Sequence, residues 1–196
     1  MRIGALVTLE IDPGKTALIL IDLQAGILAN TLAPYDNETV VASGLTLARA
    51  VKAAGGYVVA VNVDFGPGRI HGPQGLIDNP MPGGATPADY ADIRPELLDL
   101  ADIVVTKRQW GALHGTELDT LLRRRGIDTV IVGGVATNFG VETTVREGWS
   151  HGYSMIVAED ASTTFSAEMQ DFPMKYVFPR IARVRTVAEI VDALAA

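Results

Sequence analysis

Cysteine is absent from this chain of 196 residues. Its absence excludes disulfide bonds, thiolate metal sites and every mechanism in which a cysteine sulfur attacks the substrate. Apolar runs are short as well, and a run such as residues 17–21 is far from the ~20 residues needed to cross a bilayer. Because Glu10 and Asp12 precede any long apolar run, the N-terminus does not resemble a signal peptide. We therefore expect a cytoplasmic protein with no membrane partner.

Positive charge is also scarce. Sixteen Lys and Arg face 23 Asp and Glu, which gives a formal net charge of −7. This balance argues against a nucleic-acid partner, because a phosphate backbone is bound mainly by clustered Lys and Arg. Apolar residues make up 48% of the chain and charged residues 20%, close to the average for globular proteins. The length and composition predict a single domain that spans residues 1–196.

Short apolar segments alternate with amphipathic ones along the chain. The segments that are apolar on both faces, as in strands of a parallel sheet covered on two sides, are residues 16–21, 57–63, 103–106, 129–132 and 154–158, with 182–185 as a weaker edge strand. Helices are expected over residues 37–54, 116–125, 137–151, 166–176 and 187–194. The block 66–95 is rich in proline and glycine, which predicts a long loop that binds a ligand or another copy of the chain. Alternating strands and helices predict a three-layer α/β/α fold.

In such a fold, ligands bind at the carboxyl ends of the strands. The residues at these predicted ends are Asp22, Asn62, Asp64, Lys107, Gly133, Gly134, Glu159 and Asp160. Each has an ordinary structural explanation: an Asp often accepts backbone N–H bonds in a turn, a Lys is usually a solvated charge, and Glu159 and Asp160 favour caps. Their occurrence at one rim makes Asp22 and Lys107 the candidate catalytic pair.

Several other kinds of site have no support in the sequence. Neither a phosphate-binding G-x-x-x-x-G-K-[ST] loop nor a G-x-G-x-x-G turn occurs, and the G-x-S-x-G elbow of serine hydrolases is missing. The histidines His71, His114 and His151 lie on separate segments without i,i+4 pairing, so they do not predict a metal site. No cofactor is expected.

Three segments together resemble the motif blocks of the isochorismatase-like hydrolases. They are residues 16–24 (TALILIDLQ), 106–112 (TKRQWGA) and 133–144 (GGVATNFGVETT), and the resemblance extends over about residues 14–185. It implies a six-stranded parallel sheet in the order 3-2-1-4-5-6. In the family branch of nicotinamidases and related amidases, an Asp–Lys–Cys triad acts, and nicotinamidases add a metal held by an Asp-x-His motif.

The resemblance places Asp22 and Lys107 at the Asp and Lys positions, and Gly140 at the cysteine position. Asp64 is followed by Phe65 and Gly66, so the metal motif is missing. Isochorismatases similarly carry glycine at the nucleophile position and cleave a vinyl ether without nucleophile or metal. By this likeness Asp22 is the acid, Lys107 orients it and holds a substrate carboxylate, and Gly140 leaves room for the substrate.

This assignment contains an electrostatic conflict. A general acid that works near neutrality needs a raised pKa, whereas a neighbouring ammonium favours the ionised carboxylate. Desolvation by Ile21, Leu23 and Trp110, together with a substrate carboxylate that neutralises Lys107, would have to outweigh this effect.

The resemblance also implies further pocket residues. Gln24, Arg69, Trp110, Ala136 and Phe139 are expected to bind the substrate, with Arg69 as a second cation for an anionic ligand. The Val135–Ala136 peptide is expected to be cis, with the amides of Ala136 and Gly140 directed at the ligand. Ala136 stands where siderophore and phenazine isochorismatases carry a bulky aromatic, and their nearby His is also missing; the chain resembles a cysteine-less subgroup instead.

A homo-oligomer, dimer or tetramer, is expected. The alternative is a catalytically silent ligand-binding or assembly protein on the same scaffold.

Overall fold

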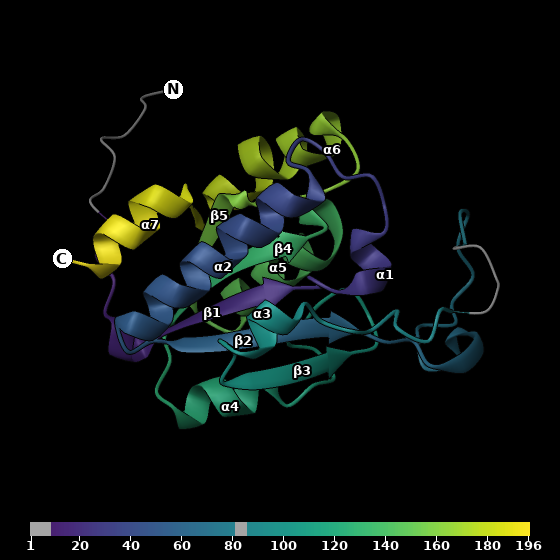
Figure 1. Ribbon diagram of the computed structural model, residues 1–196, viewed down its shortest axis with the longest axis horizontal. Coiled ribbons are helices and arrows are strands. Elements are labelled where there is room, and N and C mark those ends of the chain that lie inside the picture. The colour runs from purple at the N-terminus through teal and green to yellow at the C-terminus, as the bar shows by residue number, and fades with distance from the viewer. Residues whose placement is uncertain (1–8, 81–85) are drawn as a thin grey trace.

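The computed structural model describes residues 9–80 and 86–196, and Figure 1 shows the arrangement of its helices and strands. Residues 1–8, where no signal peptide was predicted, and residues 81–85 of the predicted loop lie outside the described residues. Six strands form one sheet in the order β3-β2-β1-β4-β5-β6, and every pairing between neighbours is parallel. The predicted α/β fold and strand order are therefore confirmed.

The strands are the predicted apolar runs, several of them longer than expected. Their bounds are β1 (Thr16–Ile21), β2 (Tyr57–Val63), β3 (Ile103–Lys107), β4 (Thr129–Val135), β5 (Ser154–Thr163) and β6 (Arg183–Arg185). The prediction that Gly133 and Gly134 follow the fourth strand was wrong, because β4 continues through both to Val135. Glu159 and Asp160 likewise lie within β5 and not after it. The register between β4 and β5 shifts between Val132 and Gly134, as in a β-bulge, and pairing resumes at Gly134, which is opposite Ser162.

The helices cover both faces of the sheet. The α-helices are α1 (Ala25–Leu28), α2 (Asn37–Ala53), α3 (Pro95–Leu98), α4 (Leu118–Arg124), α5 (Glu142–Ser150), α6 (Ala167–Phe172) and α7 (Val187–Leu194). Short 3-10 turns are η1 (Pro13–Lys15), η2 (Pro67–Arg69) and η5 (Phe178–Arg180), and π-helical turns are η3 (Thr137–Val141) and η4 (Pro173–Val177). The predicted helix over 137–151 thus begins as a π-turn, and α6 continues into η4. None of the described helices is long and apolar enough to span a bilayer.

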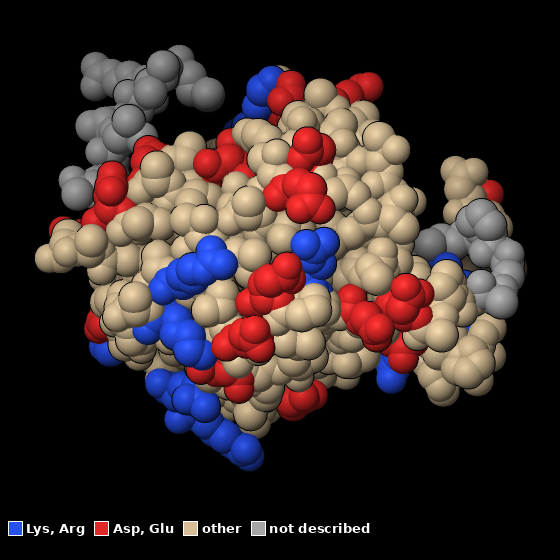
Figure 2. Space-filling model, in the orientation of Figure 1, with Lys and Arg blue, Asp and Glu red and all other residues tan. Residues whose placement is uncertain are grey.

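Two hydrophobic cores form because successive strand residues point to opposite faces. On β1, Leu18 and Leu20 pack with α2 and α7, whereas Ala17, Ile19 and Ile21 pack with α4 and α5. In Figure 1, α2 and α3 lie in front of the sheet and α5 behind it, while the η2 turn after β2 lies away from the body of the protein. On the face shown in Figure 2, acidic and basic side chains are interspersed.

Candidate active site

Asp22 and Lys107 meet at the carboxyl-terminal edge of the sheet. Asp22 follows β1 directly, and its backbone N–H donates to the Val61 carbonyl on β2. Lys107 ends β3 and is paired in register with Val63, so its side chain must cross the end of β2 to reach β1. Lys107 Nζ lies 2.7 Å from Asp22 Oδ2, and the two residues are only 1% and 5% exposed. The side chains that sequence reasoning chose from strand ends therefore form a buried ion pair.

The pair has unused hydrogen-bonding capacity. Lys107 Nζ also donates to the Gln109 carbonyl at 3.2 Å, and an ammonium group has three donors in total. Asp22 Oδ1 is buried and accepts no hydrogen bond from any residue that the structure describes. A buried carboxylate oxygen without a partner is costly in a folded protein, and such atoms point to a functional group.

Burial controls the protonation of Asp22. Desolvation raises its pKa from the ordinary 3.8 to about 6, although the charge and hydrogen bond of Lys107 both act to lower it. The electrostatic conflict identified in the sequence is therefore decided by burial. Asp22 also has a φ of +52°, in the left-handed region that non-glycine residues seldom adopt. Unusual backbone of this kind is concentrated at functional sites.

Gly140 lies beside this pair. It belongs to η3, and a Cβ atom built on it would lie 3.6 Å from Asp22 Oδ2. That Cβ would also lie 3.0 Å from Ile21 Cγ2 and 3.3 Å from the Trp110 carbonyl oxygen, both tighter than ordinary van der Waals contacts. Position 140 therefore faces the carboxylate, and the space there suits a residue without a side chain.

The side chain of Gln24 is hydrogen-bonded to backbone groups around the site. Its Nε2 donates to the carbonyls of Val63 and Tyr90, at 2.9 and 2.8 Å, and its Oε1 accepts from the Val63 N–H at 2.7 Å. Both amide hydrogens are used and the residue is fully buried. The expected contact between Gln24 and substrate is replaced here by a structural role, because its side chain links β2 to the loop that carries Tyr90.

Tyr90 is a site residue that sequence reasoning missed. Its ring packs against Gly26, where a Cβ atom would be only 2.0 Å from a ring carbon. Burial raises the pKa of its phenol, Arg69 acts to lower it, and Asp22 and Asp64 act to raise it, so the hydroxyl lies within the electrostatic reach of all three. It borders a hollow of about 410 Å³ that is also lined by Asp64 and Gly66. An isolated aromatic in a proline-rich loop carries no periodic signal that could have revealed it.

Arg69 ends the η2 turn after β2, in the same segment. Its guanidinium carbon lies 4.4 Å from the centre of the Phe65 ring, a cation–π distance. Its φ is +62°. The expected second cation therefore lies near Tyr90.

Trp110 and Phe139 form the beginning of an aromatic row. Their ring centroids are 4.8 Å apart, and Phe139 is 6.2 Å from Phe165. Trp110 is 50% exposed and Phe165 is 42% exposed, so an apolar surface adjoins the buried pair. Phe165 was not anticipated from the sequence.

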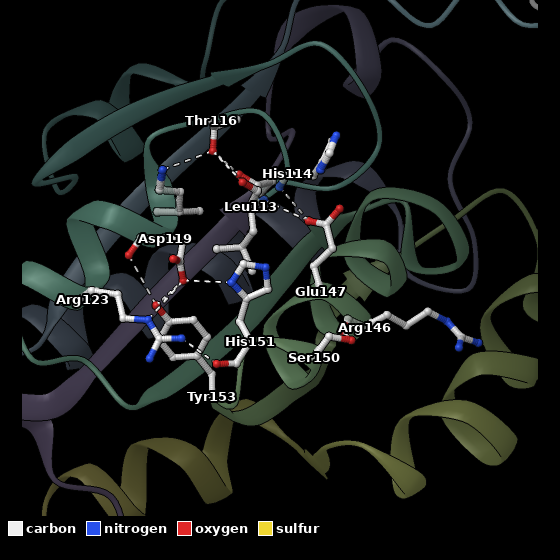
Figure 3. Close-up of polar contacts among 12 residues, drawn as sticks. Leu113, His114, Thr116, Asp119, Arg123, Arg146, Glu147, Ser150, His151 and Tyr153 are labelled. Carbon is white, nitrogen blue, oxygen red and sulfur yellow. Dashed lines mark hydrogen bonds and ion pairs between the residues drawn. The ribbon is translucent and has the colours of Figure 1, made fainter.

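Helix α5 holds the loop that carries Trp110. Glu147 Oε2 accepts the backbone N–H groups of Leu113 and His114 at 3.0 and 3.2 Å, as Figure 3 shows. Thr144 Oγ1 accepts the Ala112 N–H and itself donates to the Gly140 carbonyl. The same helix therefore fixes both the loop and the turn that contains position 140.

Ala136 is buried in the core, and its carbonyl accepts the N–H groups of Phe139 and Val141. The Val135–Ala136 peptide bond is cis. Ala136 therefore shapes the turn that carries Phe139, and the structure shows its carbonyl bonded within that turn.

The other polar residues near the strand ends are already partnered. Asn62 donates to the Ala91 carbonyl and accepts from the Thr106 hydroxyl. Asp64 is ion-paired with Arg108 at 2.7 Å, and the hydrogen bonds from Arg108 and Gly66 lower its pKa. In the part of the chain that the structure describes, no three His, Asp or Glu side chains gather as metal ligands would.

Glu159 and Asp160 contribute to structure. Glu159 accepts from the Tyr35 hydroxyl at 2.9 Å, and Asp160 Oδ1 accepts the Val187 N–H at the start of α7. The capping role predicted for Asp160 is consistent with this bond, although its place within β5 is not.

Comparison with known proteins is consistent with the fold. The sequence matches the isochorismatase domain family over residues 16–189. The protein belongs to the isochorismatase family. It is 44% identical to the isochorismatase family protein YwoC of Bacillus subtilis (strain 168) over 190 residues, which cover 94% of this chain and 97% of that protein. A solved isochorismatase family protein from Burkholderia thailandensis superposes with a TM-score of 0.89, at 37% identity over 95% of this chain and 98% of the other.

A more distant relative carries a printed activity. The ureidoacrylate amidohydrolase RutB of Enterobacter sp. (strain 638) is 29% identical over 207 residues, which cover 93% of this chain and 90% of that protein. The family assignment identifies this chain as an isochorismatase-family hydrolase scaffold.

Proposed function

We propose that this protein hydrolyses a small anionic vinyl ether of the isochorismate type, with Asp22 as general acid and with neither a cysteine nucleophile nor a metal. The observation that carries the proposal is the buried carboxyl group of Asp22, which is paired with Lys107 through one oxygen and unpartnered at the other. A raised pKa of about 6 leaves a useful fraction of this carboxyl group protonated near neutral pH.

The proposed reaction starts with proton transfer from Asp22 to the terminal methylene carbon of the enol ether. The resulting oxocarbenium ion is captured by water, which returns one proton to Asp22 and leaves a hemiketal. Collapse of the hemiketal passes the hydroxyl proton to the departing alkoxide and breaks the carbon–oxygen bond. The products are pyruvate and an alcohol, and one water is consumed in total.

The remaining residues have supporting roles in this proposal. The third N–H of Lys107 is directed to a substrate carboxylate, and neutralisation of the ammonium by that group would favour the protonated form of Asp22. Gly140 lets the η3 backbone lie close to Asp22, at a position where a Cβ atom would be crowded by Ile21 and Trp110. Trp110 and Phe139 supply an apolar surface for the rest of the molecule, and Arg69 is the proposed second cation for an anionic substrate.

A second candidate is hydrolysis of a small amide or ureido compound. It is favoured by the likeness to a protein named as a ureidoacrylate amidohydrolase. Since the chain has no cysteine, no thioester can form, and water would have to attack the carbonyl directly with ionised Asp22 as general base. The two candidates require opposite protonation states of the same carboxyl group.

An assay of product release distinguishes them. The protein is incubated with isochorismate and pyruvate is measured, in parallel with ureidoacrylate and N-carbamoylsarcosine, for which ammonia is measured. We expect pyruvate release from the first substrate, and we expect Asp22→Asn to abolish it while the circular dichroism spectrum is kept. The matched control is Asp99→Asn. It changes an exposed carboxylate that is distant from Asp22 in the sequence, and the variant should retain full activity.

Ammonia release that depends on Asp22 would replace the vinyl-ether proposal by the amide one. Undiminished pyruvate release in Asp22→Asn would remove the acid role. A folded protein that binds these compounds in a thermal-shift assay but turns over none of them would support the catalytically silent alternative.

A further inference from the structure

Three hydrogen bonds in series connect the ammonium group of Lys107 to helix α5. Lys107 Nζ donates to the Gln109 carbonyl at 3.2 Å. The side-chain amide of Gln109 donates in turn to the His114 carbonyl, and the His114 N–H donates to Glu147 Oε2 at 3.2 Å. The series therefore begins at the candidate catalytic pair and ends at a carboxylate that the proposed reaction does not use.

The carboxylate of Glu147 is bound to the backbone of this loop. Its Oε2 accepts the Leu113 N–H at 3.0 Å as well as the His114 N–H, and Figure 3 shows the carboxylate pointing at these two backbone groups. A Cβ atom at Gly111 would lie only 2.1 Å from Glu147 Oε1, so the other oxygen packs directly against the loop backbone. Hydrogen bonds to an ionised carboxylate are stronger than neutral ones, so Glu147 is a firm anchor for the loop.

The Gln109 carbonyl determines the direction of the Lys107 ammonium. Of its three N–H donors, one is bound by Asp22 Oδ2 at 2.7 Å and a second by the Gln109 carbonyl. Because the donors of an ammonium have tetrahedral geometry, these two contacts fix the direction of the third. A displacement of the Gln109 carbonyl would turn the ammonium and weaken its contact with Asp22.

The neighbouring turn of α5 supplies a second link to the site. Thr144 precedes Glu147 by three residues, so both side chains lie on the same side of the helix. Thr144 Oγ1 accepts the Ala112 N–H at 3.1 Å and donates to the Gly140 carbonyl at 2.7 Å. Helix α5 therefore holds the loop at residues 112–114, and a change at Glu147 alone leaves the Thr144 link in place.

We propose that Glu147 is a positioning residue of the candidate active site, which fixes the Lys107 ammonium against Asp22 through His114 and Gln109. It makes no hydrogen bond with the pair in the part of the chain that the structure describes, so it acts through the loop. The effect on reaction rate rests on the proposed function, whereas the effect on the titration of Asp22 does not.

Carbon-13 NMR of the Asp22 carboxyl group, assigned by comparison with Asp22→Asn, tests the proposal without turnover. Lys107 is the charged group that lowers the pKa of Asp22, and Tyr90 is a titratable group whose pKa Asp22 raises. In Glu147→Ala the ammonium is held less firmly, so the midpoint of the Asp22 titration should rise by about half a pH unit or more. Glu147→Gln keeps an oxygen that accepts both N–H groups, so its midpoint should stay close to that of the wild type.

The two variants separate positioning from a direct effect of charge. Both remove one negative charge, and loss of that charge by itself would lower the Asp22 midpoint in both. Glu142→Ala is the matched control on the same helix, because Glu142 is paired with Arg146 at 2.8 Å and its loss should leave the midpoint unchanged. With an active wild type, kcat should fall at least about tenfold in Glu147→Ala, more than KM changes, and should recover in Glu147→Gln.

An Asp22 midpoint that does not rise in Glu147→Ala would overturn the proposal, and so would an equal rise in Glu147→Gln. If circular dichroism shows that Glu147→Ala does not fold, Gln109→Ala interrupts the same series of hydrogen bonds nearer to Lys107, and the same rise must appear there. A rise in the midpoint together with no pyruvate release by the wild type would keep the positioning role and refute the vinyl-ether reaction instead.

Discussion

Gln24 holds Val63 by both of its backbone groups, accepting a hydrogen bond from the N–H and donating one to the carbonyl. A side-chain amide thus occupies the place that a neighbouring strand would take beside the end of β2. Because Gln24 follows Asp22 by two residues and also binds the Tyr90 carbonyl, one side chain connects the segment after β1 to the loop that carries Tyr90. The geometry of the candidate site therefore depends on this residue even though it has no free donor.

Replacement of Gln24 by Ala should destabilise the protein. The change leaves buried backbone groups of Val63 and Tyr90 without partners, at a cost of about 3 kcal/mol. For a chain of this size that corresponds to a fall in Tm of about 6–12 °C, measurable by calorimetry. Asn30→Ala is the control, since Asn30 is an exposed amide that also binds backbone carbonyls, and its Tm should fall by far less. An equal fall in both variants would contradict the clamping role.

The pH dependence of kcat/KM should reveal the protonation state in which Asp22 acts. Burial raises the pKa of this group to about 6. If Asp22 acts as an acid, the rate falls as pH rises through this value, because the protonated form is lost. If Asp22 acts as a base on an amide, the rate rises through the same value. A profile that is flat between pH 5 and pH 7 would exclude Asp22 from either role.

The pH dependence of the protein's stability should also reveal the titration of Asp22. Since the pKa of Asp22 is about 6 in the folded state and ordinarily 3.8, the folded protein binds more protons between these values, and the contribution of Asp22 to stability decreases as pH rises through this window. The total change is roughly 3 kcal/mol, at 1.36 kcal/mol for each pKa unit.

Urea denaturation of the wild type and of Asp22→Asn at pH 4 and pH 7 measures this contribution. We expect the variant to become more stable relative to the wild type as pH increases. The comparison isolates Asp22, because carboxylates with lowered pKa values, such as Asp64 and Glu189, affect both proteins equally. A constant difference between the two proteins across this range would contradict the raised pKa.

Gly134 should not tolerate a side chain. Its φ is +114°, and a Cβ atom there would lie 2.1 Å from the Ile21 carbonyl oxygen on the neighbouring strand. Gly134→Ala should therefore cost more than about 3 kcal/mol or prevent folding, since the clash is with backbone next to Asp22. Gly126→Ala is the matched control: its φ is +68° but its Cβ would meet nothing within 4 Å, so the cost should be only about 1 kcal/mol. Similar Tm values for the two variants would show that the clash is relieved.

The sequence predicts most of the fold because continuous apolar runs, typical of buried parallel strands, alternate with amphipathic helical segments. The strands β1 and β2 begin and end where the predicted apolar runs do. The prediction stopped too early in β4 and β5, since Gly133, Gly134, Glu159 and Asp160 have low strand propensity. Pairing with adjacent strands, resumed after the bulge, extends both strands beyond what local preference allows.

The site was predicted in part for a related reason. The ends of β1 and β3 are fixed by topology, so the approach of Asp22 to Lys107 followed from the fold. The role of Gln24 did not follow, because an amide after a strand has the same sequence signature whether it contacts a ligand or the backbone. Tyr90 and Phe165 lie in a loop and just before a helix cap, where no periodic pattern specifies the direction of a side chain.

Because this chain has no cysteine, a single cysteine placed at position 140 would be a selective chemical probe of the site. With no native thiol to compete, Gly140→Cys would introduce the sole target for alkylating reagents, at a point whose Cβ faces Asp22 Oδ2. The rate at which such a thiol is modified at different pH values would report directly on the electric field that the Asp22–Lys107 pair creates. The thiolate fraction of that introduced cysteine would therefore measure the electrostatic effect of the neighbouring carboxylate and ammonium.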